Sequence, residues 1–201
     1  MSFSVRRIKM LVPSALVVAA GALLAAPGAQ ASLLGSLLNT SACNSNAESQ
    51  PFAPWLDYSS YELAPGGTFA DNSWSLNGGA SLVPGGEPWG VTGSVSASSL
   101  SLPAGSSAQS PTTCDDLAYP TVRYFIGGTG TVAVSIVDGG VAIPAGVAVA
   151  GGAWAPSLPA VTLSAVTGLL SGGTSQVSIR FTSILGDPKI SDVFIDPCRR
   201  Y

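Results

Sequence analysis

The 201-residue chain contains no histidine. This absence excludes the Ser-His-Asp triad, hydrolysis at a metal held by histidines, and the usual proton carrier near neutral pH. The three cysteines lack the spacing of a zinc site, and the glycine-rich stretch at 127–131 lacks the following helix that a phosphate-binding loop needs. Carboxylate chemistry is the enzymatic option that remains, but the pattern of the eleven acidic residues singles out no pair.

Charged residues are also scarce, at 9% of the chain. Three of the eight basic residues precede position 32, so the remainder carries five basic against eleven acidic residues, a net charge of −6. Nucleic acids and anionic bilayers are bound through basic surfaces. The composition therefore predicts neither as a partner.

The N-terminus has the pattern of a signal peptide. Three basic residues before position 10 are followed by an apolar stretch over residues 10–26 and by small residues at Ala29 and Ala31. We expect cleavage after Ala31 and a secreted protein, extracellular or associated with the cell wall, without membrane attachment after cleavage. The alternative is an uncleaved membrane anchor, since the stretch approaches the roughly 18 residues of a spanning helix; Pro13 and Gly21 disfavour it.

Outside the cell, two of the three cysteines are expected to form a disulfide. We predict a bridge between Cys43 and Cys114, which closes a loop of about 70 residues and contributes about 4 kcal/mol in the chain-entropy model. Cys198 then remains, three residues from the C-terminus. It either pairs with another chain or is an unpaired thiol, and spacing does not decide between the two.

Beyond the signal peptide, helical periodicity is nearly absent, and alternating β-branched runs recur between turn residues. In residues 175–184, Val177, Ile179 and Phe181 share one face. The predicted strands cover residues 60–64, 67–70, 74–77, 80–83, 96–102, 121–126, 131–138, 146–154, 175–184 and 189–196. Many short strands separated by turns predict an all-β sandwich or barrel.

Two short motifs resemble the ends of a known fold. The first runs from Gly66 through Phe69 and Asp71 to "WSLNGGA" at 74–80 and "SSLSLP" at 98–103, and the second is "SDVFID" at 191–196. Both resemble carbohydrate-binding jelly rolls (galactose-binding-like modules found beside secreted glycosidases). From "ACNSNAESQPFAPWLDYSSYEL" to "VFIDP", the chain is also similar to uncharacterised secreted proteins of high-GC filamentous bacteria, which suggest no activity.

The resemblance implies an antiparallel jelly-roll β-sandwich. We expect a signal peptide over 1–31, an N-terminal segment over 32–59 that packs on the sandwich, and a single β-sandwich domain over 60–201. In such modules the Phe and Trp of the opening motif lie in the core. Because a small domain needs the roughly 150–200 Å² that each aromatic buries, we expect Phe69 and Trp74 to be buried here too.

The resemblance also implies a structural calcium ion. The family's Glu after the Phe is Ala70 in this chain, and the first Asp of the closing pair is Ser191, which leaves Asp71 and Asp192 as candidate ligands. Calcium takes six to eight oxygen ligands, several of them often carboxylates. No other cofactor is expected.

Sugars are recognised by aromatic faces flanked by polar groups. The candidate ligand-binding residues are Trp55, Tyr58 and Tyr61, in a segment that also contains Phe52, together with Trp89 between Pro88 and Gly90; Trp154 is a weaker candidate. The alternative is that these side chains pack against a sheet edge.

Three functions remain open. The first is a secreted, non-catalytic protein that binds a glycan or cell-wall polysaccharide through these aromatics. The second is a structural or adhesive envelope protein with no small ligand, and the third is a carboxylate-based glycoside hydrolase. The sequence indicates no oligomeric state.

Overall fold

In the computed structural model, β-strands make up nearly all the regular structure of the described residues, which are 47–116, 121–161 and 174–197. They belong to one unit, Leu37–Tyr201. The predicted signal peptide, Cys43 and Cys198 lie outside the described residues. None of the described helices is long and apolar enough to cross a membrane.

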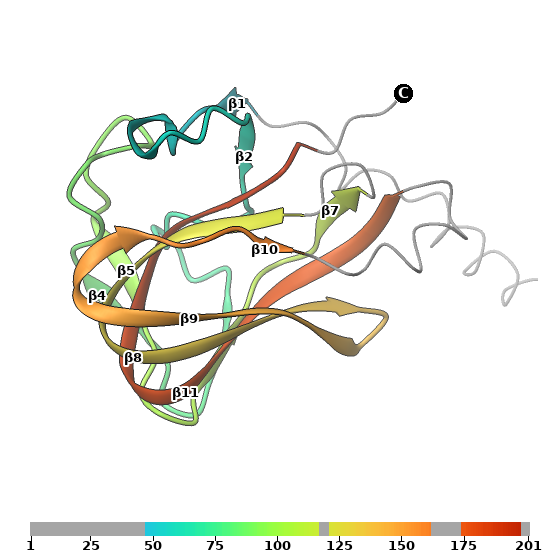
Figure 1. Ribbon diagram of the computed structural model, residues 1–201. Helices are drawn as coiled ribbons and strands as arrows, with labels where there is room; N and C mark the ends of the chain where they lie inside the picture. The colour runs from blue at the N-terminus through green and yellow to red at the C-terminus, as the bar shows by residue number, and fades with distance from the viewer. Residues whose placement is uncertain (1–46, 117–120, 162–173, 198–201) are drawn as a thin grey trace, which may run out of the picture. The chain divides into compact units, whose positions relative to one another are not determined.

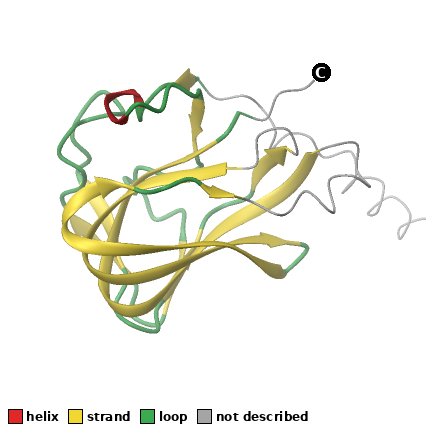
Figure 2. Ribbon diagram, in the orientation of Figure 1, coloured by secondary structure: helices red, strands yellow, loops and turns green. Residues whose placement is uncertain are grey.

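Tight turns and longer loops, such as residues 64–74 and 85–97, connect the strands (Figures 1 and 2). They are β1 (Glu48–Ser49), β2 (Tyr61–Leu63), β3 (Ser75–Asn77), β4 (Ser81–Pro84), β5 (Ser98–Ser101), β6 (Ser107–Gln109), β7 (Thr113–Asp116), β8 (Thr121–Asp138), β9 (Val141–Pro156), β10 (Ala160–Val161) and β11 (Thr174–Ile195), with one 3-10 helix at Ala53–Trp55.

Strands β8 and β11 pair with each other along most of their length and take part in both layers of the sandwich. The C-terminal half of β8 and the N-terminal half of β11 lie in the order β9-β8-β11-β6-β3. Their other halves lie in the order β10-β8-β11-β5-β4, and the end of β11 also pairs with β2, which pairs with β1. All pairings are antiparallel, so the predicted all-β jelly-roll sandwich is confirmed.

Each of these two long strands was predicted as two shorter ones. Register irregularities between Ser183 and Leu185 and between Ser191 and Phe194 bend β11 without ending it. Gly130 of β8 has a positive φ, and a Cβ there would lie 2.0 Å from the Leu185 carbonyl oxygen. The glycines that suggested a break therefore let two long strands approach closely while they curve.

Another strand prediction, residues 67–70, is wrong. The segment forms a tight turn, in which the Gly67 N–H donates to the Ala64 carbonyl and the Phe69 N–H to the Gly66 carbonyl. Phe69 itself has a φ of 55°. The turn directs its ring inward and brings Gly67 against β11, where the Val193 N–H donates to the Gly67 carbonyl.

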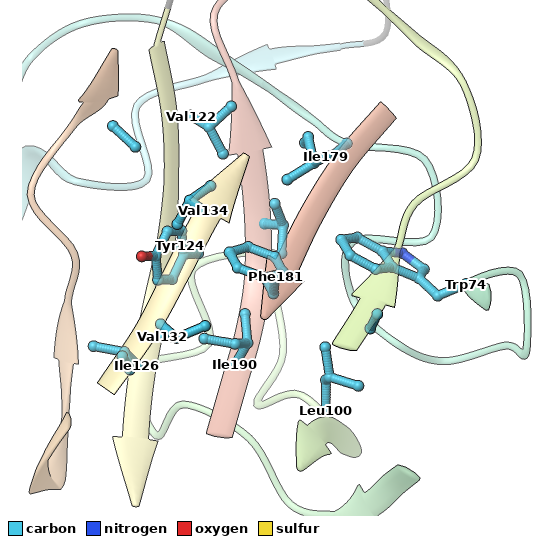
Figure 3. Packing of buried hydrophobic residues seen from close by; sticks show 14 of the residues in the cluster. Trp74, Leu100, Val122, Tyr124, Ile126, Val132, Val134, Ile179, Phe181 and Ile190 are labelled. Atoms are coloured by element: carbon cyan, nitrogen blue, oxygen red, sulfur yellow. The ribbon is translucent and has the colours of Figure 1, made fainter. Parts of the chain in front are cut away.

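The main core lies between the two layers (Figure 3). The inward faces predicted for β8 and β11 are buried there, including Val132, Val134, Ile179 and Phe181. Trp74 stacks on Phe181 with ring centroids 5.8 Å apart. The prediction that Phe69 and Trp74 belong to the core is confirmed.

A second, smaller cluster lies on the opposite face of β8 and β11. It consists of Phe52, Tyr61, Phe125 and Phe194. Phe52 stacks on Phe125, with ring centroids 5.2 Å apart and an interplanar angle of 24°. Residues 47–59 thus pack on the sandwich through Phe52.

Candidate functional site

The loop between β4 and β5 carries an exposed tryptophan on a fixed backbone. The carboxylate of Glu87, which is itself buried, accepts hydrogen bonds from the backbone N–H groups of Trp89 (2.5 Å), Gly90 (3.1 Å) and Val91 (3.1 Å). Despite this anchoring, 46% of the Trp89 surface is exposed. The loop therefore exposes a large apolar ring to solvent. Because the backbone is already fixed, a ligand that binds there loses little conformational entropy in ordering the loop.

Trp89 does not stand alone. Trp55 packs edge-on against it with ring centroids 4.9 Å apart, and both rings contact Phe125, at 5.5 Å from Trp89 and 5.4 Å from Trp55. Trp55 is half-buried. We call Trp89, Trp55 and the supporting Phe125 the Trp89 platform.

The other predicted aromatics differ in exposure. Tyr58 is 64% exposed. Tyr61 is only 3% exposed and Phe52 is fully buried, which corrects the expectation that either ring is exposed for a ligand to stack on. Both rings complete the second core cluster instead. Trp154 is half-buried, and its ring covers Gly127, where a Cβ would lie 2.7 Å from it.

Beside the second core cluster, the side chain of Arg123 in β8 is fixed by hydrogen bonds, an ion pair and a contact with an aromatic ring. Its Nε and Nη2 groups donate to the Ser157 carbonyl oxygen at 3.2 and 2.6 Å, and its Nη1 group forms an ion pair with Asp57. The guanidinium lies over the Phe52 ring, 4.0 Å from the centroid. Cation–π contact and hydrogen bonds together compensate the burial of this charge.

The same network shifts the pKa values of two neighbours. Burial alone raises the pKa of Asp57, but hydrogen bonds from Tyr61, Ser59 and Arg123 outweigh it and lower that pKa. Burial, with the adjacent carboxylates of Asp57 and Asp196, raises the pKa of Tyr61 to about 12. Asp57 is therefore ionised and Tyr61 protonated at neutral pH, with the Tyr61 hydroxyl donating to Asp57 at 2.7 Å.

These groups face a hollow that we call the polar cleft. It has a volume of about 580 Å³ and is lined by residues of the segment 56–61, by Thr121 and Arg123 at the start of β8, by Pro159, and by residues 196–197 after β11. Asp196 accepts hydrogen bonds from both the N–H (3.1 Å) and the hydroxyl (2.5 Å) of Thr121. Carboxylates thus stand on both sides of Tyr61.

A second acidic pair is fully buried behind the Trp89 loop. Asp192 lies beside Glu87 and accepts hydrogen bonds from the Ser96 hydroxyl at 2.7 Å and the Ser191 hydroxyl at 3.3 Å. Burial, together with the neighbouring Glu87 carboxyl, raises the pKa of Asp192 to about 6. The pair ties the Trp89 loop to β11.

The contacts of Asp192 differ from those expected of a calcium ligand paired with Asp71. Asp71 is exposed, and its carboxylate accepts a hydrogen bond from the Ser73 N–H within its own turn. Among the residues that the structure describes, no group of three or more acidic, histidine or cysteine side chains is arranged to hold a metal. The described contacts do not bring the expected ligand set together, and the calcium site stays a prediction.

Cys114 is buried in β7. Its predicted partner, Cys43, lies outside the described residues, as does Cys198. The bridge stays a prediction.

Sequence reasoning missed Glu87 and Arg123 as site residues. Glu87 precedes Trp89 by two positions, so a carboxylate beside a Pro-Trp-Gly turn was a usable signal for a side chain that caps the loop. Arg123 alternates with the core residues Val122 and Tyr124. Its position predicts an outward side chain, but not that Phe52 covers it.

No family model matches the chain, and no curated protein matches it. Among solved structures, it is similar to the C-terminal CBM6 of the laminarinase LamC from Zobellia galactanivorans, with 13% identity, a TM-score of 0.43, and coverage of 64% of this chain and 94% of that one. It is also similar to tailspike protein 4 of bacteriophage CBA120 (17% identity, TM-score 0.40, 66% of this chain and 20% of that one). A third is the family 11 carbohydrate-binding module from Clostridium thermocellum, in complex with a mixed-linked tetrasaccharide (11% identity, TM-score 0.39, 70% and 98%). All three TM-scores are below 0.5, so none assigns a function to this chain.

Proposed function

We propose that this is a secreted, non-catalytic protein that binds a glycan or cell-wall polysaccharide through the Trp89 platform. The observation that carries the proposal is the exposed Trp89 ring on a loop fixed by Glu87. A ring held in place loses little entropy when a pyranose stacks on it. Trp55 extends the apolar surface beside it.

Two features of the sequence agree with this function. The N-terminal pattern of residues 1–31 predicts a signal peptide and export to the outside of the cell, where polysaccharides are found. The motifs around Phe69 and Val193 resemble those of carbohydrate-binding jelly rolls.

Two carboxylates with shifted pKa values, Asp57 and Asp192, are poorly suited to hydrolysis. A glycosidase needs one carboxylic acid that holds its proton near neutral pH. The pKa of Asp57 is lowered, so this group is a poor proton donor. Asp192 has a raised pKa, but it and Glu87 are fully buried and out of reach of a polymer.

A structural or adhesive envelope protein is the second candidate. Strand β9 exposes Val141, Val147 and Val149 and carries no charged residue. Such a strand suits contact with another protein surface. In that case the protein has no small ligand.

Depletion from solution by insoluble polymers separates the two candidates. Ser32–Tyr201 is incubated with cellulose, chitin, xylan and purified cell wall, and the protein left in solution is measured. We expect retention by at least one polymer and a loss of about fivefold or more in affinity for Trp89→Ala, because an aromatic stacking contact contributes ~1–3 kcal/mol.

Leu185→Ala is the matched control, since it removes another exposed apolar side chain, one that lies outside the platform. It should bind as the wild type does. Retention that survives Trp89→Ala and Trp55→Ala together would contradict the proposed site. No retention on any polymer would favour the envelope protein, and release of reducing ends would favour the hydrolase.

A further inference from the structure

The polar cleft is a site separate from the Trp89 platform. Neither Trp55 nor Trp89 lines it. Its volume of about 580 Å³ falls within the range of small-molecule sites and accommodates a monosaccharide. Leu56, which is 80% exposed, and Pro159 provide apolar contacts for the carbon atoms of such a ligand.

The polar groups of the cleft are mainly hydrogen-bond acceptors that the protein has already oriented. The Asp57 carboxylate is held by the Tyr61 hydroxyl, the Ser59 N–H (3.1 Å) and Arg123. The Asp196 carboxylate is held by Thr121. The Asp57 carboxylate, with three donors and about four lone-pair positions, can accept a further hydrogen bond without reorganisation.

The one cation among the described lining residues is not available to a ligand. Three nitrogens of Arg123 donate to the Ser157 carbonyl and to Asp57, its face is covered by Phe52, and only 7% of its side chain is exposed. Among the described lining residues, two carboxylates stand against one guanidinium. An anionic ligand would therefore meet a net negative charge from these residues.

A ligand for this cleft must consequently donate hydrogen bonds, and positive charge favours it. We propose that the polar cleft binds a monosaccharide-sized unit that carries a protonated primary amine, that is, an amino sugar with a free amino group. The ammonium group lies toward the Asp57 carboxylate, and the ring lies between Leu56 and Pro159. Charge-assisted hydrogen bonds to a carboxylate are about twice as strong as neutral ones.

Three monosaccharides that differ in charge test the proposal. D-glucosamine, D-glucose and D-glucuronate are titrated at pH 6 into ¹⁵N-labelled Ser32–Tyr201, and backbone amide shifts are followed by NMR. We expect saturable shifts at Ser59, Ser60 and Thr121 with glucosamine, an affinity for glucose at least about tenfold lower, and no binding of glucuronate. The absence of saturable shifts with glucosamine, or equal binding of glucose, overturns the proposal.

Two variants locate the site. Asp57→Asn keeps the shape of the side chain and should reduce the affinity for glucosamine about tenfold while that for glucose changes less. Because Asp57→Asn leaves Arg123 without its ion pair and can destabilise the fold, Ser60→Phe provides a second test, since it fills the cleft without removing a charge.

Ser60→Phe should abolish binding of glucosamine, whereas Ser75→Phe, at an exposed position of β3, should leave it unchanged. Binding that survives Ser60→Phe contradicts the location. Trp89→Ala should leave glucosamine binding intact, so failure of the platform and failure of the cleft give different results.

Discussion

At the scale of single residues, buried carboxylates organise the surface that surrounds them. Glu87 uses both of its oxygens to hold the loop of Trp89, and Asp192 lies behind it on β11. Asp57 plays a similar part for Tyr61 and Arg123. These three acidic side chains therefore fix the positions of the backbone and side chains around them.

Glu87→Ala should destabilise the Trp89 loop. The substitution leaves three backbone N–H groups without their acceptor, which costs about 1–3 kcal/mol in the free energy of unfolding. Glu87→Gln retains one oxygen and should recover part of that loss. Guanidinium unfolding measures stability, and tryptophan fluorescence anisotropy reports the mobility of the indoles; an Ala variant with wild-type values in both would show that the loop is held by other contacts.

The pKa of Asp192 predicts how stability changes with pH. Folding raises this pKa from 3.8 to about 6. The contribution of Asp192 to the free energy of unfolding is therefore complete below about pH 4, and it is lost as pH rises through 6. Asp192→Asn mimics the protonated form. The variant should therefore gain stability relative to the wild type between pH 4 and pH 7, measured by guanidinium unfolding at each pH, and a difference that stays constant over this range would contradict the assignment.

At the scale of elements, the two long strands β8 and β11 connect the layers because glycine and bulges let them bend. Gly130 has a φ of 138° and faces the Leu185 carbonyl, so no side chain fits there. A Cβ added to Gly151 of β9 would meet no atom within 4 Å. Substitution of each of these two glycines by alanine tests whether the strands bend because Gly130 lacks a side chain.

Gly130→Ala should destabilise the fold by about 2 kcal/mol or more, since its Cβ collides with backbone in a conformation that L-residues rarely adopt. Gly151→Ala is the matched control and should change the unfolding free energy by less than about 0.5 kcal/mol. Thermal unfolding followed by circular dichroism measures both. Equal effects for the two variants would show that the close approach at Gly130 is relaxed elsewhere.

At the scale of the whole molecule, residues 47–59 pack on the β-sandwich. Phe52 is fully buried among Tyr61, Phe125 and Phe194, and its ring also covers the guanidinium of Arg123. The segment thereby contributes Trp55 to the Trp89 platform and Asp57 to the polar cleft. Both candidate sites depend on its attachment.

Phe52→Ala should cost about 3–5 kcal/mol in the free energy of unfolding, because it empties the centre of the second cluster and exposes the Arg123–Asp57 pair. It should also weaken ligand binding at both sites. Phe52→Leu, which retains much of the volume, should lose less. Wild-type stability of the Ala variant would mean that the segment is attached by other contacts.

The sequence by itself determined the class of fold and the burial of its central residues. Alternation along β8 and β11 predicted which side chains face the core, and the motif around Phe69 and Trp74 predicted that both rings are buried. The alternation is a local pattern with a period of two, so it can be read without knowledge of the partner strand. The prediction for Phe69 and Trp74 came instead from the resemblance of their motif to carbohydrate-binding jelly rolls.

Only the tertiary structure decided the sites. Tyr58 and Tyr61 lie three positions apart in similar sequence, yet one is exposed and the other is buried against Phe52. The contacts of Glu87 with Asp192, and of Asp57 with Arg123, join groups 105 and 66 positions apart in the chain. Such long-range contacts depend on how the layers pack. Packing then sets the exposure and the ionisation of each side chain, so a local pattern in the sequence does not reveal them.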